Sequence, residues 1–223
     1  MPANPNRLIE VLLNPSAMWQ LLREYFATAR LRRLAPVNDK ESLKDFLNTR
    51  ASFVAQTSLY GYLRTRTGMR YPELFDDDPF VVSINIAKWQ MWLACLSDLS
   101  VYAGGLLMKS PQANEQMVSA LIKDIASEIL EETGIPEDAG DQFSSHADHV
   151  RQRLALCQWQ NVTDDEQPFS HSPQTLFECA PIVDDLKQLD EEIVVNSVRF
   201  RWQKVRQDLR KALHADAVLQ SIN

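Results

Sequence analysis

Arg50 is the polar residue whose position most clearly points to chemistry, because it falls on an otherwise apolar helical face. It follows Leu43 by seven residues and Leu47 by three, and Val54 continues the same face. A guanidinium carried toward an interior needs a carboxylate or several carbonyl partners, because an unpaired buried charge is strongly unfavourable. Asp98 lies inside a strongly apolar segment and is the predicted partner.

Two interpretations of this pair remain open. In the first, which we favour, Arg50 and Asp98 form a structural ion pair that fixes the register of two helices. In the second, a polar pocket between helices binds a small anionic ligand, since arginine offers a fork of N–H donors. The ligand-binding residues predicted for this second case are Arg50, Tyr60, Arg64, Trp89 and Asp98.

A second cluster contains residue types that ligate metals. His146 and His149 are three residues apart and would share one helix face. Carboxylates that could join them are Asp141, Asp148, Glu128, Glu131 and Glu132. The Glu-x-x-His pairs of di-iron bundles are absent, so a solvated face with partly buried histidines is favoured. We predict neither a metal nor another cofactor.

The motifs of common enzyme classes are missing. The six glycines form neither G-x-G-x-x-G nor a Walker A loop, and there is no G-x-S-x-G, S-x-x-K or H-E-x-x-H. These absences argue against the common nucleotide-binding, serine-hydrolase and zinc-protease interpretations. No catalytic residue is predicted, and whether the protein is an enzyme stays open.

The elements that must position these residues are helical, because apolar residues recur at helical spacing along nearly the whole chain. We predict a short helix or arm at 1-15 and a single all-helical domain at 16-223, a bundle of six or seven helices with a long C-terminal helix. Segment 80–108 is apolar on almost every face, which predicts a central helix. The predicted helices beyond residue 36 run from Asp39 to Gly68, Asp78 to Met108, Ser110 to Gly134, 136 to 160 and 181 to 217, with a mobile loop at 161–172.

Charge is distributed unevenly along the chain. Residues 1–70 carry 11 Lys or Arg and 5 Asp or Glu, residues 71–192 carry 6 and 23, and residues 193–223 carry 6 and 2. We therefore expect the basic terminal regions to pack against the acidic middle. A basic C-terminal helix also admits nucleic-acid binding as an alternative. The larger acidic surplus disfavours that alternative.

The last helical pattern holds two apolar series in different phases. The first is Ile182, Leu186, Leu189, Ile193 and Asn196, and the second is Val198, Trp202, Val205, Leu209 and Ala212. A helix this long projects beyond the core, kinks near Asn196 or pairs across a dimer. Its first half is acidic and its second half basic, so two antiparallel copies would complement each other.

These observations favour a non-catalytic interaction or regulatory module that acts as a homodimer through the long C-terminal helix. The alternatives are an enzyme or sensor for a small anionic ligand, and a nucleic-acid-binding protein. The apolar run near the N-terminus is broken by Glu10, and no stretch is long enough to span a membrane. Together with an odd number of cysteines, this pattern predicts a cytoplasmic protein with reduced thiols and disfavours membrane binding.

Overall fold

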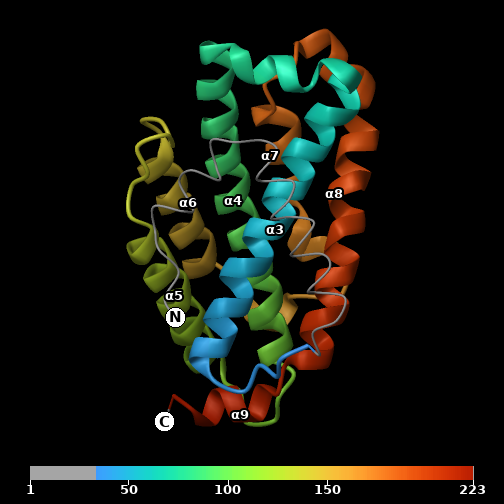
Figure 1. The fold of residues 1–223 in the computed structure, drawn as a ribbon. Coiled ribbons are helices and arrows are strands. Elements are labelled where there is room, and N and C mark those ends of the chain that lie inside the picture. The colour runs from blue at the N-terminus through green and yellow to red at the C-terminus, as the bar shows by residue number, and fades with distance from the viewer. Residues whose placement is uncertain (1–33, 223) are drawn as a thin grey trace. The chain divides into compact units, whose positions relative to one another are not determined.

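The structure, a computed structural model, describes residues 34–222, so the elements predicted within residues 1–33 lie outside the described residues. Within that range the chain forms seven α-helices and no β-strand, which confirms the predicted all-α helical bundle (Figure 1). The helices are α3 (Lys40–Thr67), α4 (Asp78–Leu107), α5 (Glu115–Thr133), α6 (Phe143–Ala155), α7 (His171–Cys179), α8 (Asp184–Ala212) and α9 (Ala215–Gln220). Short 3₁₀ turns lie at Gly68–Arg70, Pro72–Asp76, Trp159–Asn161 and Gln167–Phe169.

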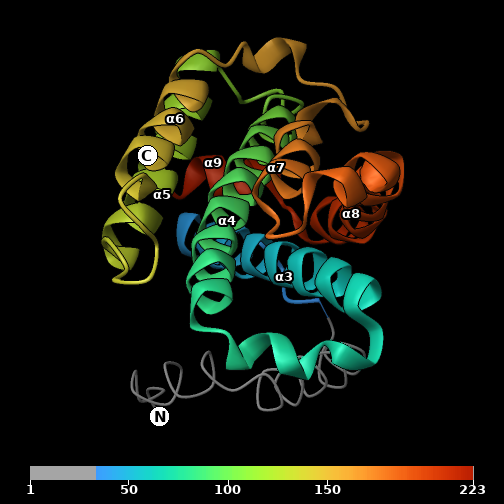
Figure 2. The ribbon, with the colours of Figure 1, turned by 90° about the horizontal axis from the view of Figure 1, so that it is seen from above.

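Helix α4 forms the centre of the bundle. It contacts α3, α5, α6, α7 and α9, and the view from above shows the other helices arranged around it (Figure 2). Buried residues lie on all of its faces, among them Trp92, Leu96, Leu99 and Tyr102. The prediction that the segment apolar on every face is the central helix is therefore confirmed.

Local sequence signals explain the ends of α3 and of α5. The Asp39 carboxylate accepts a hydrogen bond from the Ser42 N–H at 2.8 Å, and α3 stops where Gly68 adopts a positive φ of 55°. The predicted start of α5 at Ser110 is wrong by several residues. Ser110 lies in the turn after α4, and Asn114 caps the helix by accepting from the Met117 N–H at 2.8 Å.

The helix predicted over 136–160 is shorter than expected, and the segment after it is well packed. Gly140 turns the chain at a φ of 74°, so α6 begins only at Phe143. The region predicted as a mobile loop, 161–172, contains the fully buried Phe169, and the nearby Trp159 is also buried. Both rings lie in 3₁₀ turns that cover the C-terminal half of α4.

Close packing against α4 depends on two small residues. The ring of Trp159 lies against Gly104, and the side chain of Val162 lies against Gly105. A Cβ atom at either glycine would overlap these side chains, so the approach requires glycine.

The long C-terminal pattern is divided into two helices. The Val37 N–H donates to the Ala212 carbonyl at 2.8 Å, and the His214 N–H donates to the Val37 carbonyl at 2.9 Å. This isolated parallel bridge takes Leu213 out of helical geometry. Helix α8 is continuous through Asn196 and, at 29 residues, is about 43 Å long.

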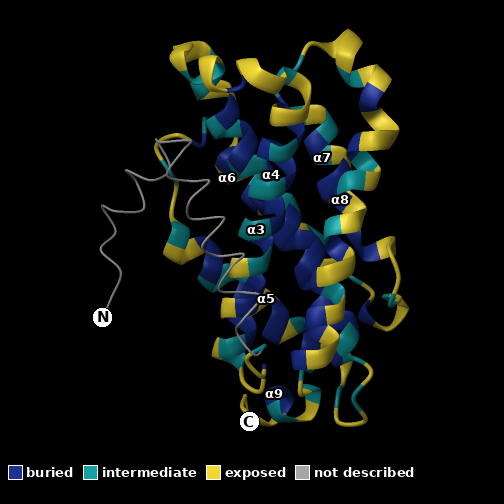
Figure 3. Ribbon diagram, turned by 45° about the vertical axis from the view of Figure 1, so that its right-hand side comes forward, coloured by how far each residue is buried: buried dark blue, intermediate teal, exposed yellow. Residues whose placement is uncertain are grey.

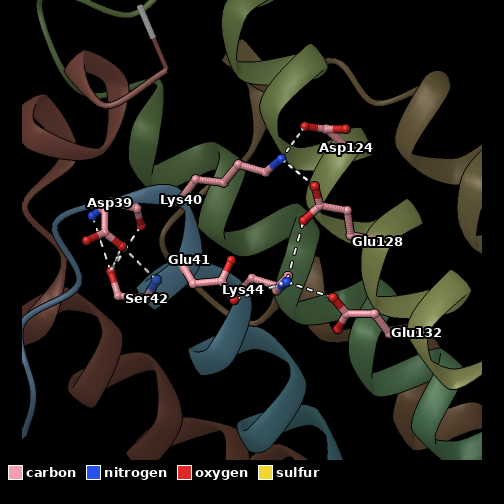
Figure 4. Close-up of polar contacts among 8 residues, drawn as sticks. All are labelled: Asp39, Lys40, Glu41, Ser42, Lys44, Asp124, Glu128 and Glu132. Atoms are coloured by element: carbon pink, nitrogen blue, oxygen red, sulfur yellow. Dashed lines mark hydrogen bonds and ion pairs between the residues drawn. The ribbon is translucent and has the colours of Figure 1, made fainter.

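The expected attraction between basic ends and acidic middle is present within this chain. Lys40 at the start of α3 donates to Asp124 and Glu128 of α5, and Lys44 donates to Glu132 at 2.9 Å (Figure 4). The hydrogen bonds from Lys40 to the two carboxylates raise the pKa of that lysine. The beginning of α3 is thus held to α5 by a cluster of ion pairs.

A second set of ion pairs joins the basic C-terminal region to the acidic middle. Asp164 lies 2.8 Å from Arg210, 3.7 Å from Arg206 and 3.4 Å from Lys109. Although burial opposes the shift, hydrogen bonds from Tyr102 and Arg210 lower the pKa of Asp164. These contacts hold the segment that was predicted to be mobile against α4 and α8.

Candidate functional site

The predicted ion pair between Arg50 and Asp98 is wrong, because the two residues face different neighbours. Arg50 on α3 is directed toward α8, where its Nη2 atom lies 4.0 Å from Asp208. Its guanidinium also lies 5.4 Å from the centre of the Phe46 ring. Asp98 on α4 instead meets α6 and α7, through Arg153 and the first residues of α7.

Asp98 is the centre of a buried polar network that joins three helices. Its carboxylate is fully buried and accepts from Arg153 at 2.6 Å and from the Ser172 N–H at 2.8 Å. The His171 N–H donates a third, longer bond of 3.3 Å. These last two donors are the first N–H groups of α7, where the helix dipole favours a negative charge. Asp98 therefore serves as an acceptor for the N-terminus of a helix distant in the sequence.

Arg153 is the network residue that the sequence prediction missed. Besides the Asp98 carboxylate, it donates to the Ser97 hydroxyl at 3.0 Å and to the Pro168 carbonyl at 2.9 Å. It could have been found, because it lies three residues after Val150 and next to Leu154, on the buried side of α6. The network satisfies the buried charges and fixes α6 and α7 on α4.

Of the other three predicted ligand-binding residues, Tyr60 and Trp89 share Asp138 as a neighbour, whereas Arg64 lies at the surface. Tyr60 is buried, and this burial raises the pKa of its hydroxyl, whereas Arg64 is exposed at the surface. The Trp89 indole N–H donates to Asp138 at 2.6 Å, and Lys88 donates to the same carboxylate at 2.7 Å. Binding of a small anion by this set stays a prediction.

A cavity of about 370 Å³ lies between α4, α6 and α7, and none of the five predicted residues lines it. Its polar lining includes His146, His149, His171, Ser97, Glu178 and Cys179. The rings of His146 and His149 are 6.2 Å apart. Within residues 34–222, no three histidine, cysteine, aspartate or glutamate side chains are arranged to share a metal ion.

Three of the polar side chains that line the cavity have shifted pKa values. Burial raises the pKa of the Cys179 thiol to about 12, so the thiol is neutral at physiological pH. Burial and the neighbouring His149 lower the pKa of His146. Burial and the charge of Arg153 lower the pKa of His171, against the attraction of Asp98. A neutral imidazole can donate and accept hydrogen bonds, and the Cys179 thiol donates to the Ala87 carbonyl rather than to a histidine.

Helix α8 carries the most prominent exposed apolar feature of the described residues. Its core-facing side packs on α3 and α7 through Val194, Val198, Trp202, Val205 and Leu209. A different side exposes Leu186, Leu189, Ile193 and Phe200, which are 42%, 77%, 68% and 73% exposed. We call these four residues the α8 stripe. Exposed positions are visible along α8 at the edge of the bundle (Figure 3).

The α8 stripe follows the spacing of a coiled-coil seam. Its first members are separated by three and then four residues, and Phe200 follows Ile193 by one heptad. The position between them is taken by the exposed Asn196. The first apolar series found in the sequence is thus the exposed seam, and the second series is the buried side.

Several exposed charges of α8 have no ion pair within residues 34–222. The acidic ones are Asp185, Glu191 and Glu192, and the basic ones are Arg199 and Lys211. By contrast, Arg206 and Arg210 bind Asp164, and Lys204 binds Asp208 at 2.6 Å. Three of the six basic residues in the second half of α8 therefore have an ion pair inside the chain.

Among the helices of residues 34–222, none combines the length and apolar character required to cross a lipid bilayer. Comparison with known protein families, curated proteins and solved structures finds no match for this chain.

Proposed function

We propose that this protein is a non-catalytic helical interaction module that acts as a homodimer, and that the α8 stripe is its self-association surface. The observation that carries the proposal is the row of exposed apolar side chains at heptad spacing, on a side of α8 that the bundle does not cover. Soluble proteins rarely leave such a row uncovered, and rows of this kind mark interaction surfaces.

Charge complementarity favours a second copy of this chain as the partner. The first half of α8 carries five acidic residues and one lysine; Asp184, Asp185, Glu191 and Glu192 are exposed, whereas Asp190 is buried and binds Arg66. The second half carries six basic residues and one aspartate; Arg199 and Lys211 have no ion pair within residues 34–222, whereas Lys204, Arg206 and Arg210 bind aspartates of the same chain. A second α8 in the opposite direction offers both signs in the required order.

A segment with only positive or only negative net charge would complement only one half of α8. Residues 1–33 carry five arginines and two glutamates, so their charge complements the acidic half of α8 alone. This comparison favours a copy of α8 over the chain's own N-terminal residues as the occupant of the stripe.

The alternative functions have less support. The predicted ligand-binding residues do not line the cavity between α4, α6 and α7, which weakens the small-anion sensor. Internal ion pairs engage Lys204, Arg206 and Arg210, which are three of the six basic residues that a nucleic-acid site on α8 would use.

The test removes apolar surface without changing charge. In the full chain, Leu189→Gln combined with Ile193→Gln should weaken the dimer by about 100-fold or more, because four side chains per dimer lose their burial. Glutamine is a good helix former and both positions are exposed, so the fold should be retained. Leu156→Gln is the matched control, because Leu156 is 73% exposed and lies outside the stripe.

Size-exclusion chromatography with light scattering gives the mass of each variant, and circular dichroism verifies its helicity. A wild-type dimer that the double substitution converts to a folded monomer supports the proposal. A monomeric wild type, or a dimer that the double substitution leaves intact, contradicts it.

A further inference from the structure

We infer that Glu192 and Arg199 select the direction of pairing, so that the two copies of α8 associate antiparallel with Glu192 of each copy opposite Arg199 of the other. This inference rests on the proposed homodimer and names the residues that determine its specificity. Both side chains are exposed, and neither forms an ion pair within residues 34–222. They lie one heptad apart, each directly before a stripe residue, Ile193 or Phe200.

The apolar side chains define the antiparallel register. When a two-fold axis passes between residues 194 and 195, Leu189 of one copy lies opposite Phe200 of the second. Ile193 then lies opposite Asn196, and each contact occurs twice. Leu189, Ile193 and Phe200, the three most exposed members of the stripe, are thereby covered in both copies.

The same register brings the flanking charges together. Residues directly before the first seam position of a heptad approach their equivalents across an antiparallel pair, and here these are Glu192 and Arg199. Two opposite-charge pairs form, related by the two-fold axis. Sliding the second helix by one heptad would place Glu192 beside Glu192, or Arg199 beside Arg199, so like charges oppose the shifted registers.

A parallel pair has the opposite electrostatics. The acidic first halves of the two helices would lie side by side, and so would the basic second halves. In that arrangement Arg199 approaches Lys204 of the second copy, and Glu192 approaches the uncharged Ser197. The charges that flank the stripe therefore favour the antiparallel direction and disfavour the parallel one.

A charge exchange in the full chain tests the inference. Glu192→Arg places two arginines opposite each other at both ends of the pair, and Arg199→Glu does the same with two glutamates. Each single variant should raise the dimer dissociation constant about 10-fold at low ionic strength. An equimolar mixture of the two variants restores both opposite-charge pairs and should form a heterodimer as stable as the wild-type dimer. Glu191→Arg is the matched control, because Glu191 makes the same charge change at a position facing away from the seam.

Sedimentation velocity and native mass spectrometry measure the dissociation constants and the composition of the mixture. Weakened single variants, an unaffected Glu191→Arg control and a preferred heterodimer support the antiparallel pairing. Dimers that are unchanged by both single variants, or a mixture that shows no preference, overturn the inference while leaving the homodimer intact. A monomeric wild type overturns the proposed function itself, so the two failures are distinguishable.

Discussion

Replacing Asp98 with asparagine should destabilise the bundle severely, although the two side chains have nearly the same shape. The wild-type carboxylate accepts hydrogen bonds from Arg153 and from the first N–H groups of α7. The amide of asparagine carries no charge and turns an N–H₂ group toward one of these donors. In either orientation of the amide, Arg153 loses the opposite charge, and the Ser97 hydroxyl and the Pro168 carbonyl are its other acceptors.

The expected loss in the free energy of unfolding follows from the burial of the Asp98–Arg153 ion pair. Removing one member of a buried ion pair typically costs about 3–5 kcal/mol, since the remaining charge is uncompensated. Arg153 retains 19% exposure of its side chain and two other acceptors, so the lower end, about 3 kcal/mol, is expected. For a chain of this size, that loss lowers the thermal midpoint by about 6–12 °C.

Urea unfolding, followed by circular dichroism at one fixed protein concentration, measures this loss. The fixed concentration is required because dimerisation contributes to apparent stability. Asp148→Asn is the matched control, since it makes the same chemical change in the exposed Asp148–Arg151 pair of α6. That control should change the free energy of unfolding by no more than about 0.5 kcal/mol.

A double-mutant cycle separates the ion pair from the shape of the site. Asp98→Asn combined with Arg153→Met leaves no buried charge, so the double variant should lose less stability than the sum of the two single losses. If Asp98→Asn stays as stable as the Asp148→Asn control, the buried network does not hold α6 and α7 on α4, and the reasoning is refuted.

Two further predictions concern packing and pH. Gly104→Ala should lower the free energy of unfolding, measured in urea, by about 1–3 kcal/mol, because the new Cβ atom overlaps the Trp159 ring. Gly61→Ala is the control, since its Cβ atom meets only the flexible end of Arg201. Equal stability of the two variants would contradict the close packing of Trp159 on Gly104. Because the pKa values of His146 and His171 are lowered from 6.5 in the folded state, the unfolded chain binds more protons, and stability should fall as the pH decreases from about 6.5. Urea midpoints measured between about pH 7.5 and 5.5 should fall in the wild type and in a His214→Gln control, but much less in the His146→Gln/His171→Gln variant. If the midpoint falls equally with pH in the wild type and in the double variant, these two histidines are not the cause.

The fold class and many helix boundaries could be predicted from the sequence because they depend on local chemistry. Gly68 and Gly134 adopt positive φ values at the ends of α3 and α5, as their positions after apolar patterns indicate. The sequence predicts Asn38 or Asp39 as the cap of this helix, and Asp39 is the residue that caps α3. The central place of α4 follows from its composition alone, since a helix without a polar face must be surrounded by other helices.

The partners of the buried charges could not be predicted, because they depend on how each helix is rotated about its axis. Arg50 and Asp98 both lie on packed helices, but one turns toward α8 and the other toward α6 and α7. The bridge between Val37 and Leu213 was equally inaccessible, since it joins residues near opposite ends of the domain. Its effect, the end of α8 at Ala212, leaves no signature in the apolar pattern.

The α8 stripe could be predicted from the sequence in part. The sequence shows two apolar series in α8 with a phase shift, which admits either a kink or two separate faces. The helix is continuous, so the series are two faces, of which the bundle covers only one. Apolar periodicity alone cannot distinguish a core stripe from an interface stripe, because burial against another subunit requires the same residues.

Sedimentation of the wild-type full chain from low to high micromolar concentration tests whether α8 joins two copies of this chain. Self-association predicts a reversible shift with concentration toward a species of twice the 25.5 kDa chain mass, and loss of that species in the Leu189→Gln/Ile193→Gln variant. A single 25.5 kDa species across the whole concentration range would contradict it.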